Sequence, residues 1–154
     1  MDAINKILLA ALAEDATVST VELAARVHLS VPAVNKRLLR LREDGVIRRY
    51  TVLTDAARVG KPLTAFILVV LQYAEGAAQA LTEALQSDPD VLECYAITGE
   101  YDYLIKVSAA DVEALENTLL RLKRQRGVLR SHTMLSLMEH KNAPTVLPKT
   151  EAPT

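Results

Sequence analysis

A cluster of basic side chains lies in the first third of this nearly neutral chain. Between positions 30 and 49 there are six Lys or Arg and two acids, a net charge of +4, whereas the 154 residues together carry −1. The six are Lys36, Arg37, Arg40, Arg42, Arg48 and Arg49. Clustered cations are typical of a surface that contacts the phosphates of a nucleic acid. A solvated helix face is the alternative, and the charge alone favours that alternative.

A second candidate for chemistry is the segment ECYAITGEYDYLIKV, residues 93–107. Three of the chain's five Tyr lie here, around a glycine turn that carries Glu100 and Asp102. Alternation along a strand directs Tyr95 and Tyr103 into sheet faces, so we expect both in the core. Tyr101 remains in the turn beside the two acids.

The other residue types that catalyse reactions or bind metals are scattered along the chain. The three His are far apart, and the glycines form no phosphate-binding cluster. Asp88, Asp90 and Glu93 lack the dense spacing of a calcium loop. Cys94 has no second cysteine, and we expect it to be a small buried apolar residue. We therefore predict no enzyme activity, no metal site and no cofactor.

Two helices joined by a tight turn are predicted to position the basic cluster. Apolar residues at helical spacing predict a supporting helix over residues 2–13. The sequence STVE, with Ser19 and Glu22 as a capping box, opens a second helix. Ser30 can cap a third helix that runs to about Arg42. This order is typical of a helix-turn-helix.

The third helix is predicted to present one polar face. At 100° per residue Val34 and Leu38 point into the core, whereas Asn35, Lys36 and Arg40 lie on the exposed side. Arg37 lies nearer the core, where it either pairs with an acid such as Glu22 or contacts a phosphate. The helix-turn-helix pattern and the positive charge of residues 30–49 together favour double-stranded DNA as a partner. The expected contacts are Ser30, Pro32, Asn35, Lys36, Arg37, Arg40, Arg48 and Arg49.

The sequence changes character after Gly45. VIRRYTVL, residues 46–53, is rich in strand formers and predicts a short strand, and TDAARVGKP, residues 54–62, reads as a linker. We therefore divide the chain into a helix-turn-helix domain (1–50), a strand and linker (51–62), a second domain (63–141) and a tail (142–154) that is expected to be flexible towards its end.

Six short elements are predicted in the second domain. They are a strand over 63–72, a helix over 76–87, strands over 91–98 and 103–109, a helix over 112–126 and a strand over 128–139. This order is the ferredoxin-like βαββαβ sandwich, with both helices on one face of an antiparallel sheet. The predicted fold class is thus α+β, with a winged-helix-like helix-turn-helix domain followed by a ferredoxin-like domain.

The first strand of this domain predicts self-association. A sheet covered on one side should alternate apolar and polar residues, but AFILVVL, residues 65–71, is apolar on both faces. Because the chain has no element left to cover the second face, we expect a second copy to cover it and the protein to form a dimer.

We expect a cytoplasmic protein without a membrane partner. The longest apolar run has seven residues, and a spanning helix needs about twenty. The N-terminus MDAINKILLAALAED has an acid at position 2 and no basic region typical of a signal peptide. The single cysteine excludes an internal disulfide, which fits a reducing compartment.

Three stretches resemble one family. VELAARVHLSVPAVNKRLLRLREDGVIRRY, VLECYAITGEYDYLIKV and SHTMLSLMEHK, in this order, are similar to the Lrp/AsnC family of feast/famine transcriptional regulators, over residues 2–148. The GEYDYL loop is the more specific motif, because many regulators share the helix-turn-helix. The resemblance implies a promoter-binding protein of bacteria or archaea that dimerises, and dimers of this family often assemble into octamers.

The resemblance also implies a small effector, usually an amino acid, bound between dimers at the loop. The implied residues are Thr98, Gly99, Glu100, Tyr101, Asp102, Ser131 and Thr133. Backbone N–H groups of a glycine turn can approach a carboxylate closely, Asp102 can take the ammonium group, and Tyr101 can wall the pocket. An ordinary hairpin loop that packs at an oligomer interface is the alternative.

The sequence departs from the family at His28, where Gly is common in the turn of the helix-turn-helix. Two functions remain open. One is a sequence-specific regulator whose assembly or DNA binding responds to an amino acid. The other is an architectural, nucleoid-associated protein that makes the same DNA contacts without an effector.

Overall fold

The chain folds into two compact units, which we describe separately. A computed structural model describes residues 1–149. Met1–Leu53 and residues 141–149 form the N-terminal unit, and Thr54–His140 form the C-terminal unit. Part of the predicted tail thus groups with the first unit, and its residues 150–154 lie outside the described part of the chain.

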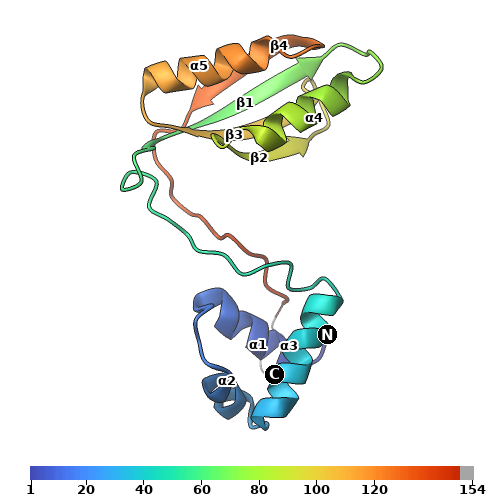
Figure 1. The fold of residues 1–154 in the computed structure, drawn as a ribbon, viewed down its shortest axis with the longest axis vertical. Coiled ribbons are helices and arrows are strands. Elements are labelled where there is room, and N and C mark those ends of the chain that lie inside the picture. The colour runs from blue at the N-terminus through green and yellow to red at the C-terminus, as the bar shows by residue number, and fades with distance from the viewer. Residues whose placement is uncertain (150–154) are drawn as a thin grey trace. The chain divides into compact units, whose positions relative to one another are not determined.

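Three helices make up the N-terminal unit: α1 (Ala3–Glu14), α2 (Thr20–Val27) and α3 (Val31–Glu43) (Figure 1). The predicted capping box is present, since the Ser19 hydroxyl accepts from Glu22 N and the Glu22 carboxylate accepts from Ser19 N. Leu8, Leu23 and Val34, one from each helix, are fully buried in the small core. The predicted helix-turn-helix is therefore confirmed.

The turn between α2 and α3 depends on an unusual backbone conformation at His28. This residue has φ 53° and ψ 42°, in the left-handed region, and its N–H donates to the carbonyls of Ala24 and Ala25. In the described chain it is the only non-glycine residue with a positive φ. The left-handed cap ends α2 and is followed, two residues later, by Ser30, the N-cap residue of α3.

The strand predicted over residues 46–53 does not form. No strand is found from Asp44 to Pro62, and Tyr50, Val52 and Leu53 are exposed. A β-strand is stable only when a neighbouring strand satisfies its backbone groups, and none lies alongside this segment within the described part of either unit. Strand-forming residue types were therefore a misleading signal here.

The C-terminal unit is an antiparallel sheet in the order β2-β3-β1-β4. The strands are β1 (Leu63–Leu71), β2 (Val91–Ala96), β3 (Tyr103–Ala109) and β4 (Val128–Leu135). The helices α4 (Ala77–Ser87) and α5 (Val112–Lys123) lie on the same side of the sheet (Figure 1). The α+β class and the βαββαβ order are confirmed, although α5 and β4 end earlier than predicted.

Apolar side chains from the sheet and both helices fill the core of this unit. Ile67, Val69 and Ile105 are fully buried, with Leu81 of α4 and Leu122 of α5 packed over them. The opposite side of β1 carries Phe66, Leu68 and Val70, which are half-buried in the single chain. No helix or strand of the described unit covers that side.

Two residues that we expected in the core are instead exposed: Cys94 because β2 is an edge strand, and Tyr95 because it pairs with Leu104 on the sheet face that no helix of the described unit covers. Cys94 is a free, exposed thiol, and Tyr95 keeps 52% of its surface accessible. Neighbouring atoms still desolvate the Cys94 thiol in part, and this desolvation raises its pKa. Tyr103, on the inner strand β3, packs against the core as expected.

Across the described residues, no helix is both long enough and apolar enough to cross a membrane.

Candidate DNA-binding face and effector loop

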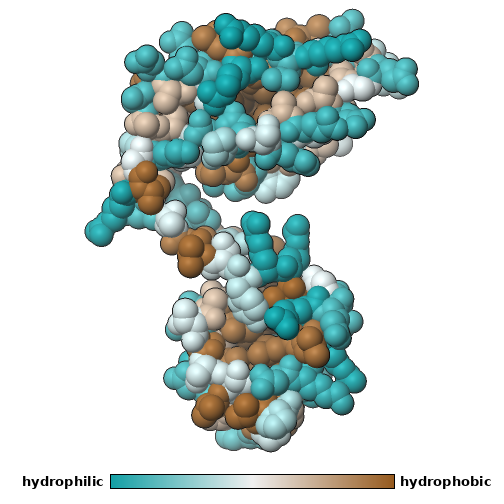
Figure 2. Space-filling model, viewed as in Figure 1, coloured by the Kyte–Doolittle hydropathy of each residue, from teal (hydrophilic) through white to brown (hydrophobic). Residues whose placement is uncertain are grey.

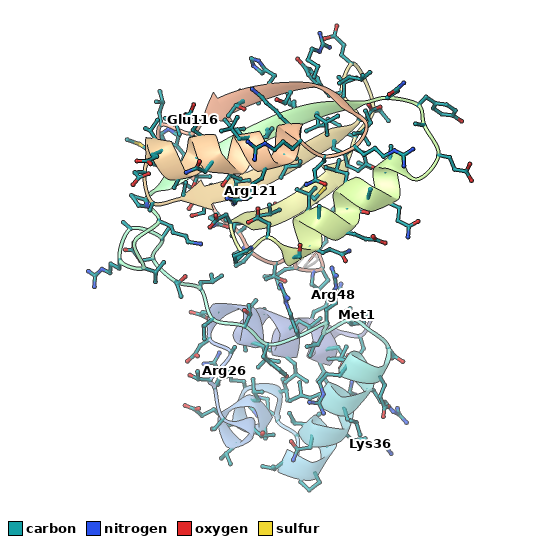
Figure 3. All side chains as sticks on the ribbon, turned by 45° about the horizontal axis from the view of Figure 1, so that its top comes forward. Met1, Arg26, Lys36, Arg48, Glu116 and Arg121 are labelled. Atoms are coloured by element: carbon teal, nitrogen blue, oxygen red, sulfur yellow. The ribbon has the colours of Figure 1, made fainter. Side chains whose placement is uncertain are left out.

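The outer face of α3 presents the polar side chains that we expected to contact DNA. Val34 and Leu41 are buried against the helical core, so the opposite positions Asn35, Lys36 and Arg40 are exposed. Figure 3 shows Lys36 projecting from α3 away from the other two helices. The helical periodicity of the sequence predicted which side of α3 is buried and which is exposed, because a three-helix unit can bury only one side of this helix.

The ends of α3 carry further candidates. Ser30 caps the helix, its hydroxyl accepting from Ala33 N at 3.4 Å, and Pro32 is exposed in the first turn. Arg48 and Arg49 follow the helix and are exposed. The surface of this unit in Figure 2 mixes apolar and polar side chains. The N-terminal half of α3 therefore exposes Pro32, the amide of Asn35 and Lys36 close together.

Arg37 differs from the other basic residues because it is held within the unit. Its guanidinium donates to the Asp2 carboxylate at 2.5 Å and to Asn5 Oδ1 at 3.0 Å, joining α3 to the start of α1. The Asn5 N–H and the Arg37 guanidinium both lower the pKa of Asp2. The partner proposed from the sequence was Glu22, but that carboxylate is occupied by the α2 cap.

Backbone contacts to β1 hold the glycine turn between β2 and β3. Asp102 N donates to Val69 O at 2.9 Å, and Asp102 Oδ2 accepts from Leu71 N at 2.7 Å. Ile97 N donates to Asp102 O at 2.9 Å and closes the turn. We expected the Asp102 carboxylate to receive an ammonium group. One of its oxygens instead accepts the hydrogen bond of the Leu71 N–H, at the bulge that ends β1.

The other loop residues are available to a ligand. Gly99 has φ 116°, which favours glycine, and no atom lies within 4 Å of the position a Cβ would take. Thr98 and Glu100 are exposed, and neither side chain has a hydrogen-bond partner among the described residues. Glu100 is thus the acid of this turn whose carboxylate is not used by the fold.

A contact that sequence reasoning missed joins this loop to β4. The Arg130 guanidinium carbon lies 5.2 Å from the centre of the Tyr101 ring, a cation–π geometry. Arg130 pairs with Val70 in the ladder and so lies near the start of β4, next to the loop. In the sequence, the available signal was that Arg130 directly precedes Ser131. Only the register of β4 against β1 shows that its side chain lies beside the loop.

Ser131 and Thr133 lie on β4 opposite Val69 and Ile67. Since Val69 and Ile67 are core residues, both hydroxyl side chains point towards the helix-covered side and are half-buried. Ser131 Oγ is buried without a hydrogen-bond partner in the described chain. The structure therefore brings Ser131 to the same end of the sheet as the loop, and places Thr133 further along.

The scattered acids do not assemble into a cation site. Asp88 and Asp90 pair with Arg121, and Glu93 pairs with Lys106. Tyr95 also donates to Glu93 at 2.8 Å, and this hydrogen bond, then Lys106, lowers the pKa of Glu93. Within residues 1–149, no group of three His, Cys, Asp or Glu side chains is arranged to hold a metal ion.

Comparisons with known proteins agree with both units. Residues 1–48 match the winged helix-turn-helix DNA-binding domain, and residues 64–146 match the Lrp/AsnC ligand binding domain. The DNA-binding transcriptional activator DecR of Escherichia coli is 35% identical over 150 residues, covering 96% of this chain and 98% of that protein. The leucine-responsive regulatory protein of Rhizobium meliloti is 33% identical over 145 residues, covering 93% of each.

Solved structures of the same kind superpose closely. A transcriptional regulator from Neisseria meningitidis in complex with L-methionine has a TM-score of 0.91 at 31% identity, covering 95% of this chain and 96% of that chain. A feast or famine regulatory protein from M. tuberculosis, also complexed with L-methionine, has a TM-score of 0.85 at 31% identity, covering 96% and 99%.

The two units define a DNA-binding regulator with a ligand-binding domain, a class of transcriptional regulators rather than enzymes. The chain belongs to the Lrp/AsnC family.

Proposed function

We propose that the protein is a sequence-specific regulator that places α3 in the major groove of double-stranded DNA. The observation that carries this proposal is the exposed face of α3, with Asn35 suited to base edges and Lys36 and Arg40 suited to phosphates. Ser30, Pro32, Arg48 and Arg49 extend the same surface. Arg37, tied to Asp2, supports the orientation of α3 and reaches a phosphate only if that ion pair opens.

We further propose that a free amino acid binds at the loop of residues 98–102 and changes DNA binding or assembly. Backbone N–H groups around Gly99 are suited to the carboxylate, Glu100 and the remaining oxygen of Asp102 to the ammonium group, and Tyr101 to the wall. Ser131 adds a hydroxyl without a partner in the described chain at this end of the sheet, and Thr133 lies two residues further along β4. Support comes from the two similar structures that hold L-methionine.

Assembly and location complete the proposal. A second copy covers the uncovered face of β1, giving a dimer, and dimers combine further, into an octamer by family resemblance. The protein acts in the cytoplasm, where its DNA and its amino-acid effector are both found.

Two measurements, made one after the other, test the proposal. Thermal-shift screening against the twenty amino acids should give at least one hit, because a ligand that binds only the native state raises the melting temperature. DNA affinity is then measured with and without that amino acid, on a fragment recovered from a random pool by binding to the protein. Tight binding with no response to any amino acid would favour the architectural function, and no preference for the recovered fragment would reject sequence-specific binding.

A further inference from the structure

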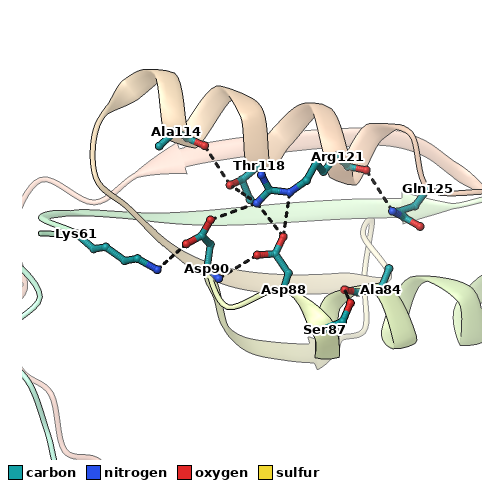
Figure 4. A network of polar contacts seen from close by, with 9 residues as sticks. All are labelled: Lys61, Ala84, Ser87, Asp88, Asp90, Ala114, Thr118, Arg121 and Gln125. Carbon is teal, nitrogen blue, oxygen red and sulfur yellow. Dashed lines mark hydrogen bonds and ion pairs between the residues drawn. The ribbon is translucent and has the colours of Figure 1, made fainter. Parts of the chain in front are cut away.

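A network of charged side chains surrounds the point where the linker enters β1 (Figure 4). Lys61 Nζ lies 2.6 Å from Asp90 Oδ1, and Arg121 of α5 reaches both Asp90 Oδ2 at 3.2 Å and Asp88 Oδ2 at 2.9 Å. Arg121 also donates to the buried Thr118 hydroxyl at 3.0 Å. The network thus joins the linker, the turn before β2 and helix α5.

Backbone contacts strengthen the attachment of the linker. The buried Ser108 hydroxyl donates to Lys61 O at 3.2 Å, while Ser108 N donates to Asp90 O at 2.9 Å. Upstream, Lys61 N donates to Ala56 O at 2.8 Å, so residues 55–61 form a closed turn. Gly60 therefore lies inside a structured segment of the C-terminal unit, although its residue type is typical of a flexible linker.

Strand β2 connects this network to the effector loop. Asp90 immediately precedes β2, and the turn of residues 97–102 directly follows it. Within the described residues β2 is an edge strand that pairs with β3 alone, so a single strand holds it in the sheet. One continuous strand of six residues thus joins the acids before it to the loop after it.

We propose that Lys61, Asp90 and Arg121 form a latch that anchors the linker to the C-terminal unit and transmits effector binding from the loop, through β2, to the connection with the DNA-binding unit. The transmission rests on the effector site proposed above, whereas the anchoring does not. The latch holds residues 55–61 on the C-terminal unit, so Gly60 does not act as a flexible hinge.

Hydrogen exchange of the full chain tests the anchoring. Lys61→Met removes the linker charge and leaves residues 63–140 unaltered, and Asp90→Asn removes its partner. Each should speed exchange of the Val59, Gly60 and Lys61 amides about fivefold or more, and the double variant should add little for these amides, since both substitutions break the same Lys61–Asp90 contact. Arg58→Met is the matched control, because the Arg58–Asp55 pair is exposed. Exchange rates equal to the control would overturn the latch.

DNA binding tests the transmission, with L-methionine as the probe. In wild type the amino acid should change affinity for the recovered DNA fragment, whereas in Lys61→Met this change should shrink several-fold, with DNA affinity in its absence preserved. An undiminished response in the variant would overturn the transmission. If L-methionine neither raises the wild-type melting temperature nor alters DNA binding, the transmission of this effector is rejected together with its site, and hydrogen exchange still decides the anchoring.

Discussion

Among the described residues, His28 carries the clearest conformational strain. A non-glycine residue in the left-handed region places its Cβ too close to the following carbonyl oxygen. Replacing His28 with Gly should relieve this strain and stabilise the protein by about 0.5–1 kcal/mol, after the entropy that glycine adds to the unfolded chain is included. Urea unfolding of the full chain measures the change. His28→Ala is the control, and a Gly variant no more stable than the Ala variant would contradict the prediction.

Two glycines with positive φ should respond differently to alanine. A Cβ at Gly127 would lie 2.7 Å from Ala77 Cβ, the first residue of α4, whereas a Cβ at Gly99 would meet nothing within 4 Å. Gly127→Ala should therefore cost about 2–4 kcal/mol, through backbone strain and overpacking together, and Gly99→Ala about 1–2 kcal/mol through strain alone. Equal losses in urea unfolding would show that α4 moves away at little cost.

The exposed basic side chains on and after helix α3 predict how DNA affinity depends on salt concentration. If Lys36, Arg40 and Arg49 contact phosphates, each Ala variant should lower affinity for all sequences and reduce the slope of log affinity against log salt by about one unit. Asn35→Ala should instead change sequence preference, because an amide reads base edges. Fluorescence titration over a range of salt concentrations measures both effects.

Lys123→Ala provides the control for this series. Lys123 lies in the last turn of α5, where its charge complements the helix dipole, so the salt slope should not change. A reduced slope for Lys123→Ala with unchanged slopes for the α3 variants would move the DNA surface to the C-terminal unit.

The latch of Lys61, Asp90 and Arg121 predicts that part of the stability of the protein is lost in acid. The Lys61 ammonium, with Arg121 as a second partner, lowers the pKa of Asp90 below its ordinary value of about 3.9. An acid with a lowered folded pKa stabilises the protein above its unfolded pKa, and that stability is lost as pH falls through the folded pKa. Asp88, the other acid at this site, shares Arg121.

Melting temperatures of wild type and Asp90→Asn should therefore differ by a constant amount above about pH 5 and converge as the pH falls below about 4. Scanning calorimetry between pH 7 and pH 2.5 measures this convergence. A difference that stays constant down to pH 2.5 would mean that the carboxylate charge of Asp90 contributes nothing to the fold.

For the whole molecule, the uncovered sheet face predicts the oligomeric state. Phe66, Leu68 and Val70 point away from α4 and α5, and an apolar face of this kind is stable in water when a second copy covers it. Light scattering at micromolar concentration should show no monomer of 16.9 kDa. Leu68→Glu should produce monomers, because it would bury an unpaired charge.

Glu116→Lys is the control for the dimer. Glu116 is exposed on α5, on the helix side of the sheet (Figure 3), so its charge should not affect assembly through the other face. A stable wild-type monomer, or a Leu68→Glu protein that remains a dimer, would reject the sheet-face interface.

Local patterns in the sequence were sufficient to predict most helices and strands. The capping box of Ser19 and Glu22, the helical spacing around Val34 and the order of strands and helices after Leu63 all depend on neighbours within a few residues. Such interactions act within one element, so residue type and spacing determine them without knowledge of the fold. The exposed face of α3, and with it the candidate DNA contacts, could be predicted for the same reason.

Only the tertiary structure decided which distant groups meet. Arg37 pairs with Asp2, Asp102 supports Leu71, and Lys61 pairs with Asp90, across separations of 35, 31 and 29 residues. Strand order placed β2 at an edge and exposed Cys94, and the lack of a neighbouring strand kept residues 46–53 from forming a strand. In each case the outcome depends on which segment lies alongside, and packing across the whole chain determines that, not residue type.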